Sequence, residues 1–190
     1  MVIDHLSEQP SHDGVAYLYF GYQDRTQQRP IDVFSIFTRQ LVSQLPELPP
    51  DILEVHSKKG TESPGLEMLR RLLFSMPKRF SNLGRRVFIV CDALDEMDEH
   101  QQRDVLLPLF HDMEDTGFEI FLTSRPHPED VRSSFADAIQ LELTPHYRDL
   151  HSYVEEKITT SPRTKKMIEN SQSLRLENVI SAVASSAEGM

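Results

Sequence analysis

The sequence lacks most of the features that secreted, membrane-spanning and nucleic-acid-binding proteins need. Its 190 residues include one cysteine, Cys91, so no disulfide can form within the chain, which favours a cytoplasmic location. No apolar run approaches the roughly 18 residues of a membrane span, and the N-terminus has no signal-peptide pattern. The formal net charge is −10 and the basic residues are scattered, so neither nucleic acid nor a membrane is an expected partner.

A glycine-rich phosphate loop is absent as well. None of the seven glycines is followed by Lys-Ser or Lys-Thr, so the pattern G-x-x-x-x-G-K-[ST], whose N–H groups and lysine cradle phosphates, does not occur. The eight histidines include no His-Glu-x-x-His pattern, which argues against a zinc site. Ser124 follows an apolar run but stands outside any Gly-x-Ser-x-Gly turn, which argues against a hydrolase triad.

The most informative segment that is present runs from Val87 to Glu96. Five apolar residues end on Asp92, and Asp95 and Glu96 follow closely. Such a run is typical of a strand buried on both faces of a parallel sheet. Acids at its carboxyl end lie where open α/β sheets bind ligands, and they suit Mg²⁺ and an attacking water. The alternative is a solvated helix start, since Asp98 and Gln101 resemble a capping box.

The remaining pattern alternates strands with helices and indicates an α/β fold with a parallel sheet and flanking helices. After residue 144 only helical patterns follow, which predicts an α/β domain over 1–144 and the start of a helical region over 145–190. The strands are expected at 15–20, 87–92, 118–122 and, as a half-exposed edge, 138–143; the helices at 30–45, 66–76, 99–110, 129–135 and 147–158, with further helical segments over 167–184.

Two strand ends together carry a resemblance to a known family. The segment Asp92-Ala93-Leu94-Asp95-Glu96 is followed about thirty residues later by Thr123-Ser124-Arg125-Pro126, and then by Leu143-Thr144-Pro145 and a helix containing tyrosine. This order resembles the NACHT-type nucleotide-binding module of the STAND NTPases, especially fungal NACHT proteins and the nephrocystin-3-like N-terminal domain. The likeness covers most of the chain.

The resemblance implies a role for each matching residue. Asp92 would be the Walker B acid that holds Mg²⁺, and Ala93 the small residue that leaves room beside it. Asp95 and Glu96 would position or activate water. Arg125, with Ser124 beside it, would sense the γ-phosphate, to whose oxygens a guanidinium is suited. The alternative for Arg125 is an ordinary strand-end arginine paired with a surface acid.

The departure from the family is the missing phosphate loop. The chain resembles a P-loop NTPase-like module without its first strand, its loop and most of its first helix. Mg²⁺ and ATP or GTP are implied for a complete module, and no cofactor and no activity for this chain alone. Without the first strand, 138–143 is expected either to pair beside 118–122 or to be poorly held.

Three functional hypotheses follow from the sequence. The first is an incomplete nucleotide-dependent signalling module, with protein partners or self-association. The second is a non-catalytic interaction or scaffold domain that keeps the NTPase-like shell. The third, a metal-dependent nuclease using Asp92, Asp95 and Glu96, is disfavoured because the acidic surface would repel nucleic acid.

Overall fold

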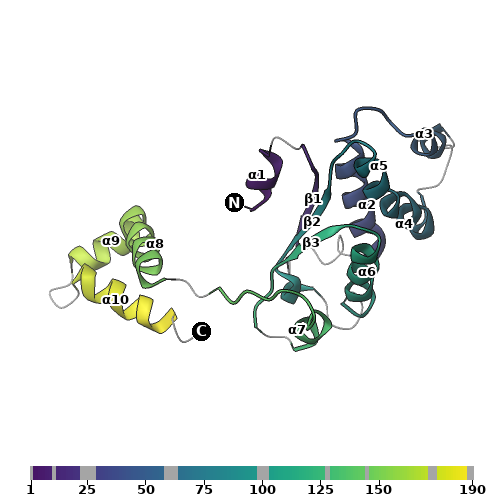
Figure 1. Cartoon of the computed structure of the whole chain (residues 1–190). Coiled ribbons are helices and arrows are strands. Elements are labelled where there is room, and N and C mark those ends of the chain that lie inside the picture. The colour runs from purple at the N-terminus through teal and green to yellow at the C-terminus, as the bar shows by residue number, and fades with distance from the viewer. Residues whose placement is uncertain are drawn as a thin grey trace. The chain divides into compact units, whose positions relative to one another are not determined.

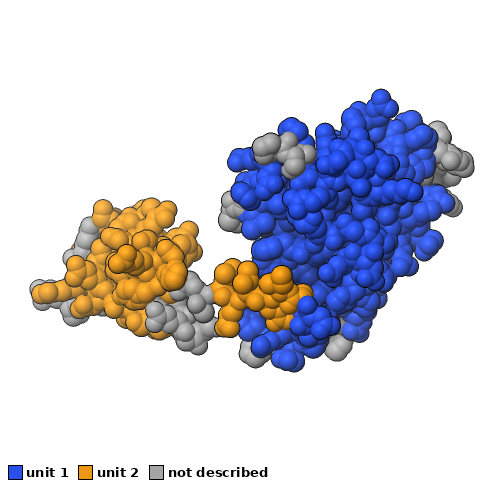
Figure 2. All heavy atoms as spheres, viewed as in Figure 1, with its two compact units in different colours: residues 1–137 blue, residues 138–190 orange. Residues whose placement is uncertain are grey.

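The computed structural model describes residues 2–9, 12–21, 29–57, 64–97, 103–126, 129–143, 146–170 and 175–187. The chain divides into two compact units, Met1–Asp137 and Ala138–Met190, which Figure 2 colours separately. The first unit contains the sheet, the acidic segment 92–96 and the segment 123–126, and the second contains three of the described helices.

A three-stranded parallel sheet forms the centre of the first unit, in the order β1-β2-β3. The strands are β1 (Gly14–Tyr19), β2 (Val87–Asp92) and β3 (Glu119–Leu122). The register places Tyr17 opposite Val90, and Val90 opposite Phe121. The expected α/β class and these strands are confirmed. The carboxyl ends of β2 and β3 therefore lie side by side. This brings the acidic segment 92–96 and the segment 123–126, which contains Arg125, to the same edge of the sheet.

Helices cover the sheet mainly on one side, where Figure 1 shows α2, α4, α5 and α6. Their buried side chains, among them Phe34, Leu73 and Phe110, join Ala16 and Ile89 of the sheet in one apolar core. The helices described in the first unit are α1 (Val2–Ser7), α2 (Pro30–Val42), α3 (Pro50–Ser57), α4 (Leu66–Phe74), α5 (Met76–Ser81), α6 (Asp104–Asp115) and α7 (Glu129–Ser134).

The outer edge of β1 is closed by two glutamine side chains from helix α2 and the turn after it. Gln44 accepts from the N–H of Val15 at 2.9 Å and donates to the carbonyl of Val15 at 2.7 Å. Gln40 does the same with Tyr17, at 2.8 and 3.0 Å. Each amide replaces one residue of a neighbouring strand, so the polar groups of this edge are satisfied without another strand.

Two expectations need correction. Residues 139–143 form no strand, and Ile139, Leu141 and Leu143 are 94%, 79% and 85% exposed. The alternating pattern specifies two faces but supplies no partner edge, and a strand without a partner is not stable alone. The helix expected over 66–76 ends at Phe74, and Pro77 stands in the first turn of the separate helix α5, where a proline costs nothing. The start expected at residue 99 lies outside the described residues.

The second unit contains the helices α8 (Tyr147–Thr160), α9 (Pro162–Glu169) and α10 (Leu176–Ala187). Helix α8 packs against both α9 and α10, with Ile158 and Ile180 buried. The Ser161 side chain accepts from the N–H of Thr164 and begins α9, as an N-cap does. The expected helical character of this region is confirmed for its described part. None of the helices within the described ranges is sufficiently long and apolar to cross a membrane.

Candidate functional site

The candidate site begins where β2 ends on Asp92. The hydroxyl of Thr123, the first residue after β3, donates to Asp92 Oδ1 at 2.5 Å and accepts from the N–H of Ala93 at 3.0 Å. The backbone of Thr123 bonds on both sides, from its N–H to the carbonyl of Cys91 and from the N–H of Leu94 to its carbonyl, each at 2.9 Å. Thr123 therefore holds one oxygen of the Asp92 carboxylate by a hydrogen bond.

Arg125 from the β3 side meets both remaining acids of the β2 side. Its backbone N–H donates to Asp95 Oδ1 at 3.1 Å, and its guanidinium lies 3.5 Å from Asp95 Oδ2 and 3.9 Å from Glu96 Oε1. The Arg125 side chain is 71% exposed, whereas that of Asp95 is 6% exposed. Asp95 is thus a buried acceptor that holds the segment after β3, and the Arg125 side chain is largely exposed to solvent.

The sequence-predicted residues differ in how well the structure brings them together. Arg125 contacts Asp95 and Glu96, and Asp92 ends the neighbouring strand β2 at the same sheet edge. The Ser124 hydroxyl donates to the carbonyl of Arg125 at 3.0 Å and is exposed. The sequence alone assigns no role in the site to Thr123. The sequence feature that could have identified it is its position directly after one strand, next to a strand that ends on Asp92.

Ala93 adopts an unusual backbone conformation within this site. Its φ of 60° and ψ of 52° are left-handed, which costs an L-residue roughly 1–2 kcal/mol. The turn directs the chain from β2 into the 3₁₀ helix η2 (Leu94–Glu96). Two hydrogen bonds to Thr123 stabilise this turn, from the N–H of Ala93 to the hydroxyl and from the N–H of Leu94 to the carbonyl. The strained turn therefore places Asp95 and Glu96 at the end of β2 where Asp92 stands.

We expect Ala93→Gly to raise the free energy of unfolding by about 0.5–1 kcal/mol, because glycine adopts a left-handed conformation without strain. Ala93→Val should lower it by about 1–3 kcal/mol, since a β-branched residue tolerates positive φ worst. Urea denaturation measures both changes. Ala16→Gly in β1 is the control and should be destabilising, because Ala16 is buried in ordinary strand conformation. A destabilised Ala93→Gly variant would contradict the argument.

The donor set fits a magnesium ion that is shared with a phosphate. Within the described ranges no three His, Cys, Asp or Glu side chains form a group that could hold a metal ion by themselves. Mg²⁺ is ordinarily held by one or two carboxylates together with phosphates and waters, and the Asp92 carboxylate is the residue here that would serve as such a ligand. Neighbouring Cys91 is buried, which raises the pKa of its thiol, so it is no nucleophile here.

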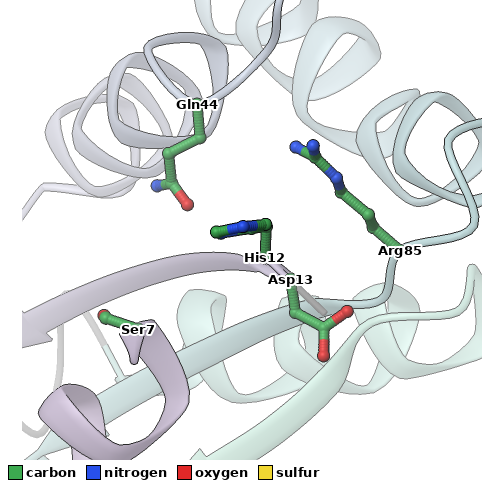
Figure 3. Close-up of a pocket in the computed structure, with 5 residues that line it drawn as sticks. All are labelled: Ser7, His12, Asp13, Gln44 and Arg85. Atoms are coloured by element: carbon green, nitrogen blue, oxygen red, sulfur yellow. The ribbon is translucent and has the colours of Figure 1, made fainter. Parts of the chain in front are cut away.

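An open hollow of about 540 Å³ lies elsewhere in the first unit. Figure 3 shows its lining residues: Ser7, His12 and Asp13 before or at the start of β1, Gln44 after α2, and Arg85 before β2. It therefore lies at the amino ends of the strands, opposite the acids. Because of this position the hollow does not belong to the candidate site. Two of its lining residues already make hydrogen bonds: Asp13 accepts from the N–H of Arg86, and Gln44 donates to the carbonyl of Val15.

Comparison with known proteins places the chain in a family. The sequence model of the family described as "Nephrocystin 3, N-terminal" matches residues 1–125. No curated protein and no solved structure matches the chain. The matched range includes the whole three-stranded sheet and every residue of the site from Asp92 to Arg125. The chain belongs to the nephrocystin 3 N-terminal family.

Proposed function

We propose that this chain contributes the acidic wall and the phosphate-sensing arginine of a NACHT-like, nucleotide-dependent signalling module, and that it needs a phosphate loop to bind ATP or GTP. The observation that carries the proposal is that Arg125 contacts Asp95 and Glu96 at the carboxyl edge of a parallel sheet, where Asp92 ends β2 and bonds to Thr123. This edge is where open α/β sheets bind their ligands.

Each residue has a task in such a module. Asp92 would hold Mg²⁺ together with the β- and γ-phosphates, and Thr123 would keep its carboxylate oriented. The guanidinium of Arg125 would contact the γ-phosphate, because its side chain is 71% exposed although it lies beside Asp95 and Glu96. Glu96 would orient the attacking water. When bound, magnesium supplies charge neutralisation for the transferring phosphoryl group.

Nucleotide titration tests this function. The chain alone is expected not to bind Mg-ATP or Mg-GTP analogues, because nothing in its sequence replaces the phosphate-cradling N–H groups and lysine. The chain fused at its N-terminus to the phosphate-loop strand and helix of another family member should bind with a dissociation constant of about 1 µM, or about −8 kcal/mol. Asp92→Asn in the fusion should weaken binding only when Mg²⁺ is present.

The control is a fusion whose loop lysine is replaced by alanine, which should not bind. Tight binding by the chain alone would overturn the requirement for the loop. A folded fusion that binds neither nucleotide would overturn the nucleotide function itself.

That last outcome would favour the second candidate, a non-catalytic interaction domain. One observation supports it: Tyr17 and Phe121 lie in one row across the sheet and are each 40% exposed, and Tyr19 is 54% exposed. Parallel sheets are usually covered on both faces, and exposed aromatic side chains are typical of protein-binding surfaces.

A further inference from the structure

Arg103 is a buried arginine that connects the two halves of the acidic site. It precedes α6, and its side chain is 3% exposed. Its guanidinium donates to the carbonyl of Asp95 at 3.3 Å and to that of Met97 at 3.0 Å. It also donates to both carboxylate oxygens of Asp130 in α7, each at 3.0 Å.

These contacts join the two segments that carry the residues of the site. The carbonyls of Asp95 and Met97 belong to the loop that follows β2 and carries the acids. Asp130 lies in the first turn of α7, five residues after Arg125 on the β3 side. A single guanidinium therefore spans from the acidic loop to the segment that follows the sensing arginine.

Core packing alone does not account for an arginine at this position. Burying a guanidinium carries a large solvation cost, and an apolar residue of similar volume often stabilises a fold better. What an apolar residue cannot supply is a rigid fork of donors aimed at several acceptors. Arg103 uses this fork on two backbone carbonyls and a carboxylate that belong to separate segments.

We propose that Arg103 is a positioning residue: by holding the loop after β2 and the helix after β3 at a fixed spacing, it sets where Arg125 stands relative to Asp95 and Glu96. The importance of that spacing for a γ-phosphate rests on the proposed function. The spacing itself is a property of this chain and can be measured without a nucleotide.

Amide hydrogen exchange in the chain alone tests the proposal. The N–H of Arg125 reports the spacing directly, because it donates to Asp95 Oδ1 across the site. In Arg103→Lys the fork is lost, and we expect this amide to exchange about tenfold faster or more, while core amides such as that of Ile89 keep their rates. Asp130→Asn removes the charge partner with little change of volume and should act in the same direction.

Arg70→Lys is the matched control, since Arg70 makes a more exposed ion pair with Asp112 at 2.8 Å from a different part of the fold. It should leave the Arg125 amide unchanged. The proposal is overturned if the Arg125 amide keeps its rate in Arg103→Lys and Asp130→Asn, or if the amide of Ile89 accelerates equally, which would indicate a general structural role. Nucleotide titration of the fusion tests the proposed function separately, so either idea can fail alone.

Discussion

Phe80→Ala should lower the free energy of unfolding by about 3–5 kcal/mol, as truncation of a buried aromatic residue does. The ring is fully buried at the end of α5 and belongs to the core between the helices and the sheet. Domains of this kind are stable by only about 5–15 kcal/mol, so about a fifth or more of the total would be lost. Urea denaturation, with the slope checked for constancy, measures the change.

Phe121→Ala is the matched control, because it removes the same ring from a position that is 40% exposed, and it should cost about 1 kcal/mol. Equal losses for the two variants would contradict the burial argument.

Gly14 gives the Phe80 prediction a second, independent test. A Cβ at Gly14 would stand 2.6 Å from Cε1 and 2.8 Å from Cζ of Phe80, so Gly14→Ala should cost about 1–3 kcal/mol through overpacking. In the Phe80→Ala background the obstacle is gone, and Gly14→Ala should become neutral or stabilising. A double-mutant cycle measures this coupling, and additive losses would show that the ring does not restrict Gly14.

Much of this architecture was predictable from local pattern. The strands at Val87–Asp92 and Glu119–Leu122 were visible because buried parallel strands are continuous apolar runs. Once both strands were placed, the meeting of Asp92 with the segment around Arg125 followed from the geometry of parallel sheets, in which carboxyl ends share an edge.

What the sequence did not reveal depends on contacts between distant residues. The bonds from Thr123 to Asp92 and from Arg103 to Asp130 join residues 31 and 27 positions apart, and no local pattern encodes them. The left-handed conformation of Ala93 was hidden because alanine, unlike glycine or asparagine, carries no signal for positive φ. The alternation over 139–143 was visible but misleading, since pairing requires an edge that the segment does not itself contain.

The structure also distinguishes the environments of Asp95 and Glu96, to which the sequence assigns the same role. Both oxygens of Asp95 face Arg125, one at 3.1 Å from its N–H and the other at 3.5 Å from its Nε, in a side chain that is 6% exposed. Glu96 is 23% exposed and lies near Gly21, two residues after β1, where an added Cβ would be 3.9 Å from the Glu96 carboxylate. A group that activates water must be reachable by water, which favours Glu96.

Glu96→Gln in the phosphate-loop fusion should therefore lower the kcat of ATP hydrolysis by about 10²–10⁴-fold, the usual contribution of a general base. Its dissociation constant for Mg-ATP should not change, because the amide is isosteric and Asp92 remains. Asp95→Asn should instead lower stability, since it weakens the contacts with Arg125, and should lower kcat less at a temperature where it stays folded. If Asp95→Asn abolishes turnover while binding and stability persist, the buried acid is the catalytic one and this ranking is wrong.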